Sequence, residues 1–366
     1  MNRRERILTL LSGGQPDRIP WNGDLDWWMR AERNMGTLNP EEDGPVDRLK
    51  LHRRLGVGFY LQGHNPFKTI IDGVTITTEK NGNDTTVRYE TPVGTVYETQ
   101  RYLPTAFSEA YTHHLLEDAE DIPVLKYIWE HTRFEPDYEL CNALHENLDG
   151  YGVVLVYTPR TPFMQLVACD AGIENLVFAM MDDPEGFEEL FEIMTQKYEE
   201  AAAISIASPA DCVMIPENLS SEVVGKPYYE KYVAPFHRKW TAKIREAGKY
   251  SFIHMDGTLQ GLLREVAGNG FDVLEALTPA PVGDMTLEEI NEAVAGRCIV
   301  WGGIPGGYFT DTVSDADFDE YVKNLLAFYK THKNFTVGVS DQICPGSREE
   351  RIARVEQLCE KYGWYE

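Results

Sequence analysis

The sequence lacks the features that mark several common classes of protein. Its six cysteines are scattered and form no CxxC pair, which favours reduced thiols in a cytoplasmic protein over a disulfide framework. No apolar run approaches the roughly 18 residues that a membrane span requires. The charged residues 1–6 and the short apolar stretch after them do not resemble a signal peptide. We therefore expect no membrane association.

Positive charge is also scarce. The chain has 34 basic residues against 59 acidic ones, and its formal net charge is −25. Such a chain repels a phosphate backbone, so nucleic acid and anionic membranes are excluded as partners. The acidity favours solubility, or a surface that docks a basic patch on a partner protein. A glycine-rich phosphate loop after the first predicted strand is missing as well, which argues against an open dinucleotide-binding sheet.

What the sequence does contain is a regular alternation of short apolar runs and amphipathic segments. Six runs predict strands that are buried on both faces: 153–157, 212–215, 251–254, 272–275, 298–301 and 335–339. Two upstream runs, 18–22 and 56–61, complete a set of eight. Helical patterns follow the later strands, so the 366 residues predict a single α/β domain, a (β/α)8 TIM barrel.

Three helices have clear local signals. The range 347–362 carries apolar residues at steps of three and four. The range 226–240 has Pro227 at a favoured first position and Pro235 inside, which predicts a kink. The range 286–295 opens with Thr286 and Glu289 in the spacing of a capping box.

Residues 65–115 have a different pattern and interrupt the barrel between its second and third strands. Polar, β-prone runs at 74–78 and 85–89 flank the turn sequence at 81–84, and a third run follows at 94–98. This range predicts a small antiparallel insertion that packs on the barrel.

In such barrels the reactive groups lie where the strands end. The candidates at these positions are His64, Glu217, His254, Asp256, Glu275, Trp301, Asp341 and Cys344. His, carboxylate and thiol side chains are ligands for zinc, although no motif of tight local spacing supports a metal. Each residue also has a structural alternative: hydrogen bonding for Glu217 and His254, a helix cap for Asp256, and an inert thiol for Cys344.

A second cluster holds aromatic and basic side chains after the first strand. It comprises Trp21, Trp27, Trp28, Met29, Arg30 and Arg33. It predicts either a wall for a flat substrate, with Trp21, His64 and Trp301 as contacts, or packing of the insertion.

Several segments, taken in order, resemble the uroporphyrinogen decarboxylase superfamily. They are 2–7 with 15–20, 91–95, 228–240, 254–257 and 345–352. The resemblance covers essentially the whole chain and implies a TIM barrel. It offers two activities, a cofactor-free decarboxylase and a cobalamin-dependent methyltransferase.

The departures from the family patterns separate these two branches. The decarboxylases carry an MRQAGR segment, whereas residues 29–33 read MRAER. The methyltransferases bind zinc through an H-x-C motif and a later cysteine. His254 matches the histidine, while Asp256 and Asp341 stand at the cysteine positions and Cys344 follows three residues on. This pattern is more similar to the aryl-ether demethylases, which use carboxylates and histidine.

The resemblance therefore implies a zinc-assisted methyltransferase. It would move a methyl group from a methoxylated aromatic donor to the Co(I) corrinoid (cobalamin) of a partner protein. Glu217, His254, Asp341 and Cys344 are the predicted metal ligands, and Asp256 is the predicted catalytic group, as a ligand or by orienting His254. The alternatives are a cofactor-free decarboxylase of a uroporphyrinogen-type acid and a catalytically silent barrel that serves as a scaffold.

Overall fold

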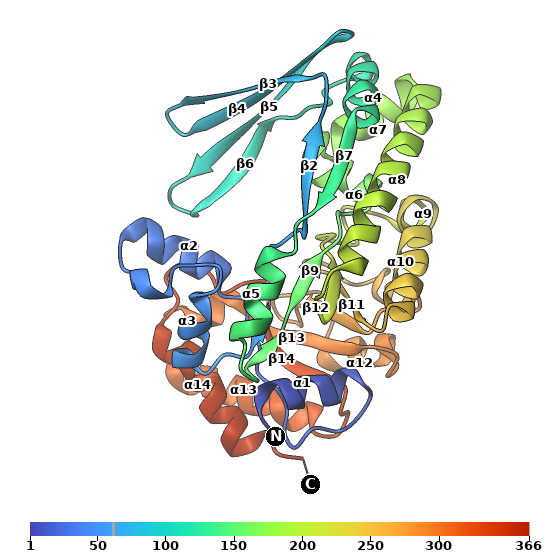
Figure 1. Cartoon of the computed structure of the whole chain (residues 1–366). Coiled ribbons are helices and arrows are strands. Elements are labelled where there is room, and N and C mark those ends of the chain that lie inside the picture. The colour runs from blue at the N-terminus through green and yellow to red at the C-terminus, as the bar shows by residue number, and fades with distance from the viewer. Residues whose placement is uncertain (61–62, 366) are drawn as a thin grey trace.

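The computed structural model describes residues 1–60 and 63–365. A six-stranded parallel sheet lies at its centre, in the order β14-β13-β12-β11-β10-β9 (Figure 1). The strands are β9 (Leu155–Tyr157), β10 (Cys212–Ile215), β11 (Tyr250–His254), β12 (Val273–Leu277), β13 (Ile299–Pro305) and β14 (Phe335–Ser340). All six lie within or next to the predicted apolar runs, and the predicted α/β class with a parallel sheet is confirmed.

Further parallel contacts extend from both edges of this sheet. Strand β1 (Phe59–Tyr60) pairs with β8 (Gly152–Val153), which precedes β9 directly. Isolated parallel bridges join Trp21 to Val337 and Asn22 to Gly58. The strand predicted at 18–22 is therefore reduced to single bridges, because Pro20 has no N–H to donate to a longer ladder. The strand predicted at 56–61 shortens to β1, and Leu61 lies outside the described residues.

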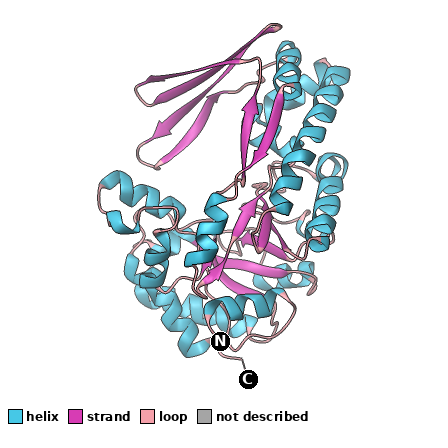
Figure 2. Cartoon of the chain, viewed as in Figure 1, coloured by secondary structure: helices cyan, strands magenta, loops and turns pink. Residues whose placement is uncertain are grey.

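Helices alternate with the strands along the chain and surround them (Figure 2). Those flanking the parallel strands are α3 (Arg48–Leu55), α5 (Glu139–Asn147), α6 (Pro162–Gln165), α7 (Gly172–Asp182), α8 (Pro184–Ala207), α10 (Ala234–Glu246), α11 (Leu263–Ala267), α12 (Leu287–Val294), α13 (Asp315–Tyr329) and α14 (Glu349–Tyr362). The predicted capping box is confirmed at α12, where Thr286 and Glu289 bond reciprocally.

The predicted kink around Pro235 takes a particular form. A short helix α9 (Lys226–Tyr228) leads directly into a π-helical turn η4 (Tyr229–Val233) and then into α10 (Ala234–Glu246), without a break in the helical stretch. Pro235 lies directly after the π-helical turn, and this turn accommodates the missing N–H of the proline.

The inner face of the sheet is filled by side chains from alternate strand positions. Phe252 and Trp301 pack with their ring centroids 5.3 Å apart, and Tyr60 lies 4.8 Å from Trp301. Helix α1 (Arg3–Leu11) adds Leu10 and its apolar neighbours to this cluster. Because Arg4 pairs with Asp211 just before β10, α1 covers the amino ends of the strands.

Both ends of the described chain meet beside α1. The Asp17 carboxylate binds the Met1 amino group at 2.8 Å, and its backbone carbonyl accepts a hydrogen bond from the Tyr365 N–H at 3.1 Å. Figure 1 shows the two ends at the same pole of the molecule.

An antiparallel sheet lies at the opposite pole, between β1 and β8 in sequence. It consists of β3 (Thr75–Asn81), β4 (Asp84–Thr91), β5 (Gly94–Leu103) and β6 (Ser108–His113), packed on α4 (Ile122–Glu130). A separate pair, β2 (Phe67–Ile71) and β7 (Thr132–Pro136), connects it to the rest. The sequence did not predict β2, β6 or β7, and the limits 65–115 remain a prediction.

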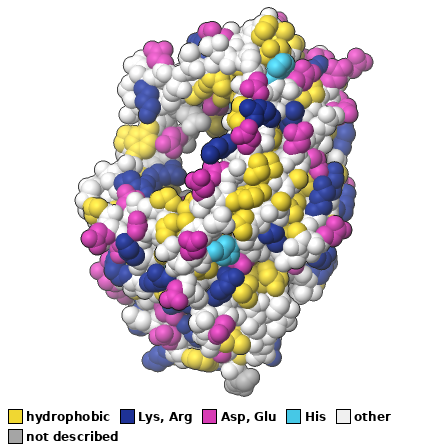
Figure 3. Space-filling model, in the orientation of Figure 1, with side chains coloured by type: hydrophobic (Ala, Val, Ile, Leu, Met, Phe, Trp, Pro, Cys, Tyr) yellow, Lys and Arg dark blue, Asp and Glu magenta, His cyan; other side chains and the backbone are white. Residues whose placement is uncertain are grey.

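The turn between β5 and β6 reaches back to helix α2 (Asp26–Met35). The Trp27 indole N–H donates to the Ala106 carbonyl at 2.8 Å, and Arg30 lies 3.5 Å from Glu109. Figure 3 shows an opening on this side, between the antiparallel sheet and the body of the molecule.

Among the described residues, no single helix has the length and apolar composition to cross a membrane. Segments 162–170 and 172–182 have the required length and apolar composition only when they are taken together, and the chain bends by 120° between them.

Candidate metal centre

The centre is built on the carboxyl ends of two neighbouring strands. His254 ends β11 and lies in register with Glu275 of β12. The His254 Nδ1 is 2.6 Å from the Glu275 Oε2, and the Tyr60 hydroxyl donates to the other oxygen of Glu275 at 3.1 Å. A carboxylate at this position binds the N–H on Nδ1, so that Nε2 is the nitrogen that a metal ion would bind in place of a proton.

Two carboxylates converge on that nitrogen. The His254 Nε2 lies 3.6 Å from the Asp341 Oδ1 and 3.8 Å from the Asp256 Oδ1. The potential ligand atoms of the three residues all lie within 4.8 Å of one another. A tetrahedral ion with bonds of about 2.0–2.2 Å sets neighbouring ligand atoms roughly 3.3–3.6 Å apart. The donor set suits one divalent ion, and the two distances from Nε2 lie at and just above this range.

The charges of the centre are strongly coupled. Burial lowers the pKa of His254, but the charge and hydrogen bond of Glu275, together with Asp256 and Asp341, raise it overall to about 10. Partial burial, together with the charges of Asp256 and Glu275, raises the pKa of Asp341 to about 6, against the opposing charge of His254. Three carboxylates surround a single imidazole, so a divalent cation would neutralise an excess of negative charge.

Backbone geometry places Asp341 at the rim. It follows β14 directly and has φ of 75°, in the left-handed region that aspartate tolerates better than most residues. Its side chain is 45% exposed, so one side of the group of three faces solvent. An open position of this kind distinguishes catalytic from structural zinc sites.

Glu217, a predicted ligand, lies outside this group of three. Its fully buried carboxylate is 2.9 Å from the His237 Nε2 on α10 and accepts the Thr161 N–H at 3.2 Å. The hydrogen bonds continue from His237 through Tyr229 to Asn269. Glu217 thus links the loop after β9 to the outer helices, and its ligand role remains a prediction.

Cys344 also lies outside the group. Its thiol is 3.3 Å from the Gly306 carbonyl and 3.6 Å from the Ser347 hydroxyl. All six cysteines are unpaired in the structure. The predicted role of Cys344 in metal binding is untested.

The three predicted substrate contacts differ in exposure. Trp21 is buried and stacks on Phe309 at 6.3 Å, and Trp301 is buried in the inner cluster. His64 is half-buried, and its carbonyl accepts the Tyr157 N–H at 2.8 Å. Contact of these three side chains with a substrate remains a prediction.

Sequence reasoning missed two charged residues near the rim. Asp24 is buried, accepts hydrogen bonds from the Asp26 N–H and the Gln342 amide at 2.8 Å, and has a pKa raised well above its usual value by burial and by Asp26. Arg160 lies three residues after β9, the one strand of the central sheet whose carboxyl end carries no predicted site residue.

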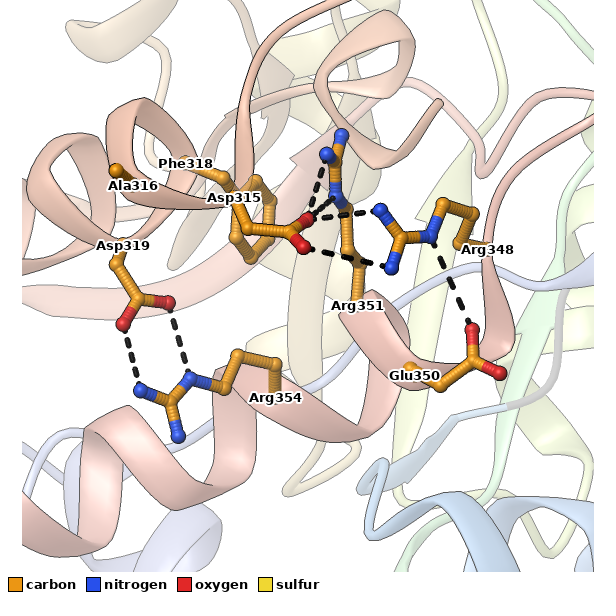
Figure 4. Close-up of a pocket in the computed structure, with 8 residues that line it drawn as sticks. All are labelled: Asp315, Ala316, Phe318, Asp319, Arg348, Glu350, Arg351 and Arg354. Carbon is orange, nitrogen blue, oxygen red and sulfur yellow. Dashed lines mark hydrogen bonds and ion pairs between the residues drawn. The ribbon is translucent and has the colours of Figure 1, made fainter. Parts of the chain in front are cut away.

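A surface pocket of about 370 Å³ lies elsewhere, between α13 and α14 (Figure 4). Its arginines are already paired with acids: Arg351 lies 2.7 Å from Asp315, and Arg354 lies 2.6 Å from Asp319. None of the residues of the metal centre lines it.

A parallel sheet with a group of polar side chains at its carboxyl edge is the architecture of many α/β enzymes. A sequence model of the family described as uroporphyrinogen decarboxylase (URO-D) matches residues 108–362. This range is more than half of the 366 residues, and the chain belongs to that family.

One solved structure shows a similar fold. A methyltransferase from Methanosarcina mazei matches with a TM-score of 0.63 and 13% sequence identity, over 99% of both chains. At this identity the likeness shows the fold alone. A Streptomyces avermitilis protein described as an orotidine 5'-phosphate decarboxylase matches over 52% of this chain and 66% of its own, with 13% identity and a TM-score of 0.28, too low to support an argument. No curated protein matches the sequence.

Proposed function

We propose that this chain is a zinc-assisted methyltransferase that moves a methyl group from a methoxylated aromatic donor to the Co(I) corrinoid of a partner protein. The observation that carries the proposal is the convergence of Asp256 and Asp341 on the Nε2 of His254. The likeness of fold to a methyltransferase is consistent with it.

In this proposal His254, Asp256 and Asp341 would hold the zinc ion. The ion would supply Lewis-acid stabilisation of the phenolate that leaves when the methyl group is transferred. Glu217 and Cys344 are not part of the proposed set, because each side chain has partners elsewhere.

The remaining residues orient this set. Glu275 fixes the His254 ring by binding Nδ1, and the Tyr60 hydroxyl fixes Glu275 in turn. Since Glu275 is fully buried, its position is set by packing and does not depend on a bound substrate.

The proposal also includes the finer architecture. We take residues 1–366 as one domain whose strands close into a (β/α)8 barrel, with 65–115 as an insertion. The bridges at Trp21 and Asn22 and the β1–β8 pair support closure, because they connect β14 to β9 around the other side. Six unpaired cysteines are consistent with a cytoplasmic location.

The direct test has two arms. Purified protein is analysed for zinc, and it is then incubated anaerobically with a reduced corrinoid protein and a panel of methoxyarenes. We expect near-stoichiometric zinc and formation of methylated corrinoid, both lost in His254→Ala. Absence of methylated corrinoid with every methoxyarene would overturn the reaction, and absence of zinc would overturn the metal centre.

A cofactor-free decarboxylase is the second candidate, because the matching family is described by that activity. The MRAER segment at 29–33 departs from the family's arginine pair, and Arg33 is bound to Asp43. Release of CO₂ from uroporphyrinogen by metal-free protein would favour this candidate over the methyltransferase.

A further inference from the structure

The candidate ligand Asp341 lies on the turn that follows β14, and few contacts hold its side chain. Within residues 1–60 and 63–365, its carboxylate has one ion pair, with His254 at 3.6 Å, and accepts no hydrogen bond. The position of this carboxylate therefore depends on the backbone of residues 340–343.

The segment that bridges to β14 near the start of the chain holds this turn on both sides. Before the turn, the Asn22 N–H donates to the Val337 carbonyl at 3.0 Å. After the turn, the Ile343 N–H donates to the Asp24 carbonyl at 3.0 Å. Asp341 therefore lies between two backbone attachments to the same segment.

The side chain of Asp24 adds a third attachment, at the residue next to Asp341. Its Oδ2 accepts a hydrogen bond from the Gln342 amide at 2.8 Å, and its Oδ1 accepts the Asp26 N–H at 2.8 Å, at the start of α2. Asp24 is only 4% exposed, so water does not readily replace either bond. Loss of a partner would leave a buried polar group unpaired, which costs free energy. The Asp24 carboxyl group thus joins the start of α2 to the turn that carries Asp341.

Asp24 also lies close to the histidine of the centre. Burial raises its pKa well above the usual value, and the charges of Asp26 and Glu275 raise it further. Glu275 is the carboxylate that binds the Nδ1 of His254 at 2.6 Å. Asp24 therefore contacts the turn of Asp341 and lies within electrostatic range of the group that orients His254.

We infer that Asp24 is a positioning residue of the candidate metal centre, which fixes Asp341 for metal binding by holding the Gln342 amide. Asp24 acts through the turn and needs no contact with the ion. Loss of an outer partner of a metal ligand commonly weakens metal affinity by about 10- to 100-fold. The inference rests on the proposed function, because it takes Asp341 as a ligand.

The test removes the side-chain attachment and leaves the backbone attachment in place. Asp24→Ala should weaken zinc binding at least about tenfold, measured by competition with a chromophoric chelator. The visible spectrum of the Co²⁺-loaded protein should change as well, because it reports the geometry of the ligands. Gln342→Leu removes the donor of the same hydrogen bond and should also weaken zinc binding. The double variant should bind zinc about as weakly as Asp24→Ala, since both changes remove one interaction.

Asp24→Asn is the conservative variant. Its amide oxygen can accept the Asp26 N–H, and its NH₂ group can donate to the oxygen of the Gln342 amide after that amide turns over. We expect its zinc affinity to stay within about threefold of the wild-type value, and its Co²⁺ spectrum to match that of the wild type.

Asp272→Ala is the matched control. The Asp272 carboxylate also joins two neighbouring segments, because it accepts the Ser251 N–H at 2.7 Å and the Ser251 hydroxyl at 2.8 Å. It lies at the amino ends of β11 and β12, away from the candidate metal centre. This variant should lose stability in urea and keep the zinc affinity and the Co²⁺ spectrum of the wild type.

The outcomes separate this inference from the proposed function. Wild-type zinc affinity in Asp24→Ala and Gln342→Leu would overturn the inference alone, and so would equal weakening by Asp272→Ala. Weaker zinc binding in Asp24→Ala, with a wild type that binds zinc but transfers no methyl group, would support the inference and overturn the proposed reaction. A wild type that binds neither zinc nor cobalt would overturn both. If Asp24→Ala does not fold, Gln342→Leu decides, because its side chain is only half-buried.

Discussion

At the scale of single residues, the candidate centre depends on a carboxylate that would not touch the metal. Glu275 is bound to the Nδ1 of His254 and to the Tyr60 hydroxyl. Carboxylates in this position orient a ligating imidazole and raise its basicity. The affinity of the centre should therefore respond to Glu275 as well as to the three proposed ligands.

We expect Glu275→Gln to weaken zinc binding by about 10- to 100-fold, because a neutral amide supports the imidazole less. Competition with a chromophoric chelator measures the affinity. Glu217→Gln is the matched control, since it changes a buried carboxylate beside a different histidine and should leave zinc binding unchanged. A weaker affinity in the control would instead identify Glu217 as a ligand.

A second residue-scale prediction concerns Asp170, which is 5% exposed. Its folded-state pKa of about 7 exceeds the unfolded value near 3.9. Between these values the folded chain keeps a proton that the unfolded chain releases. The stabilisation is therefore complete below about pH 4 and decreases as the pH rises through about 7.

The variant Asp170→Asn should remove this dependence while its amide oxygen keeps the hydrogen bond from Gln165. Relative to the variant, the wild type should lose on the order of 2 kcal/mol of unfolding free energy between pH 5 and pH 8. Urea denaturation at both pH values measures the difference. If the unfolding free energies of the two proteins changed equally between pH 5 and pH 8, the raised pKa of Asp170 would be contradicted.

At the scale of elements, helix α1 covers the amino ends of the parallel strands and adds its apolar side chains to the core. Leu10 is buried in the inner cluster, so Leu10→Ala should lower the unfolding free energy by about 2–5 kcal/mol. Leu8→Ala, on a half-buried position of the same helix, should cost less. Because α1 lies at the end of the strands away from His254, zinc content should be unchanged in both. Equal losses of stability would contradict the assigned packing.

The sequence predicted the parallel strands well because they are buried on both faces and read as continuous apolar runs. Every residue of β3 is exposed, so the run at 74–78 was predicted from its β-prone residues and the turn at 81–84, not from alternation. Strands β2, β6 and β7 were not predicted. The pairing of β2 with β7 joins residues more than sixty positions apart, and no local pattern specifies such a partner.

The candidate site was predicted only in part. His254, Asp256 and Asp341 were found because they follow strands, and ends of parallel strands lie together. Glu217 has the same local context, but its side chain bonds to the outer helix α10. The Nε of Arg160 is buried without a hydrogen-bond partner, and only the tertiary structure reveals this.

At the scale of the whole molecule, ligand binding to the native state alone must raise its stability. Zinc at a free concentration 100 times its dissociation constant should add about 2.7 kcal/mol to the unfolding free energy. Urea denaturation with and without zinc measures this gain. Cys344→Ser should keep it and Asp341→Asn should lose most of it, whereas an equal gain in both variants would place the ion elsewhere.

The meeting of both chain ends on Asp17 allows the order of the polypeptide to be rearranged. A short linker could join the two ends, and new ends could be opened in the exposed turn between β3 and β4. Such a circular permutant would carry its new ends on the antiparallel sheet, at the pole opposite the old ones (Figure 1). A corrinoid-carrying domain could then be fused genetically on that side of the molecule.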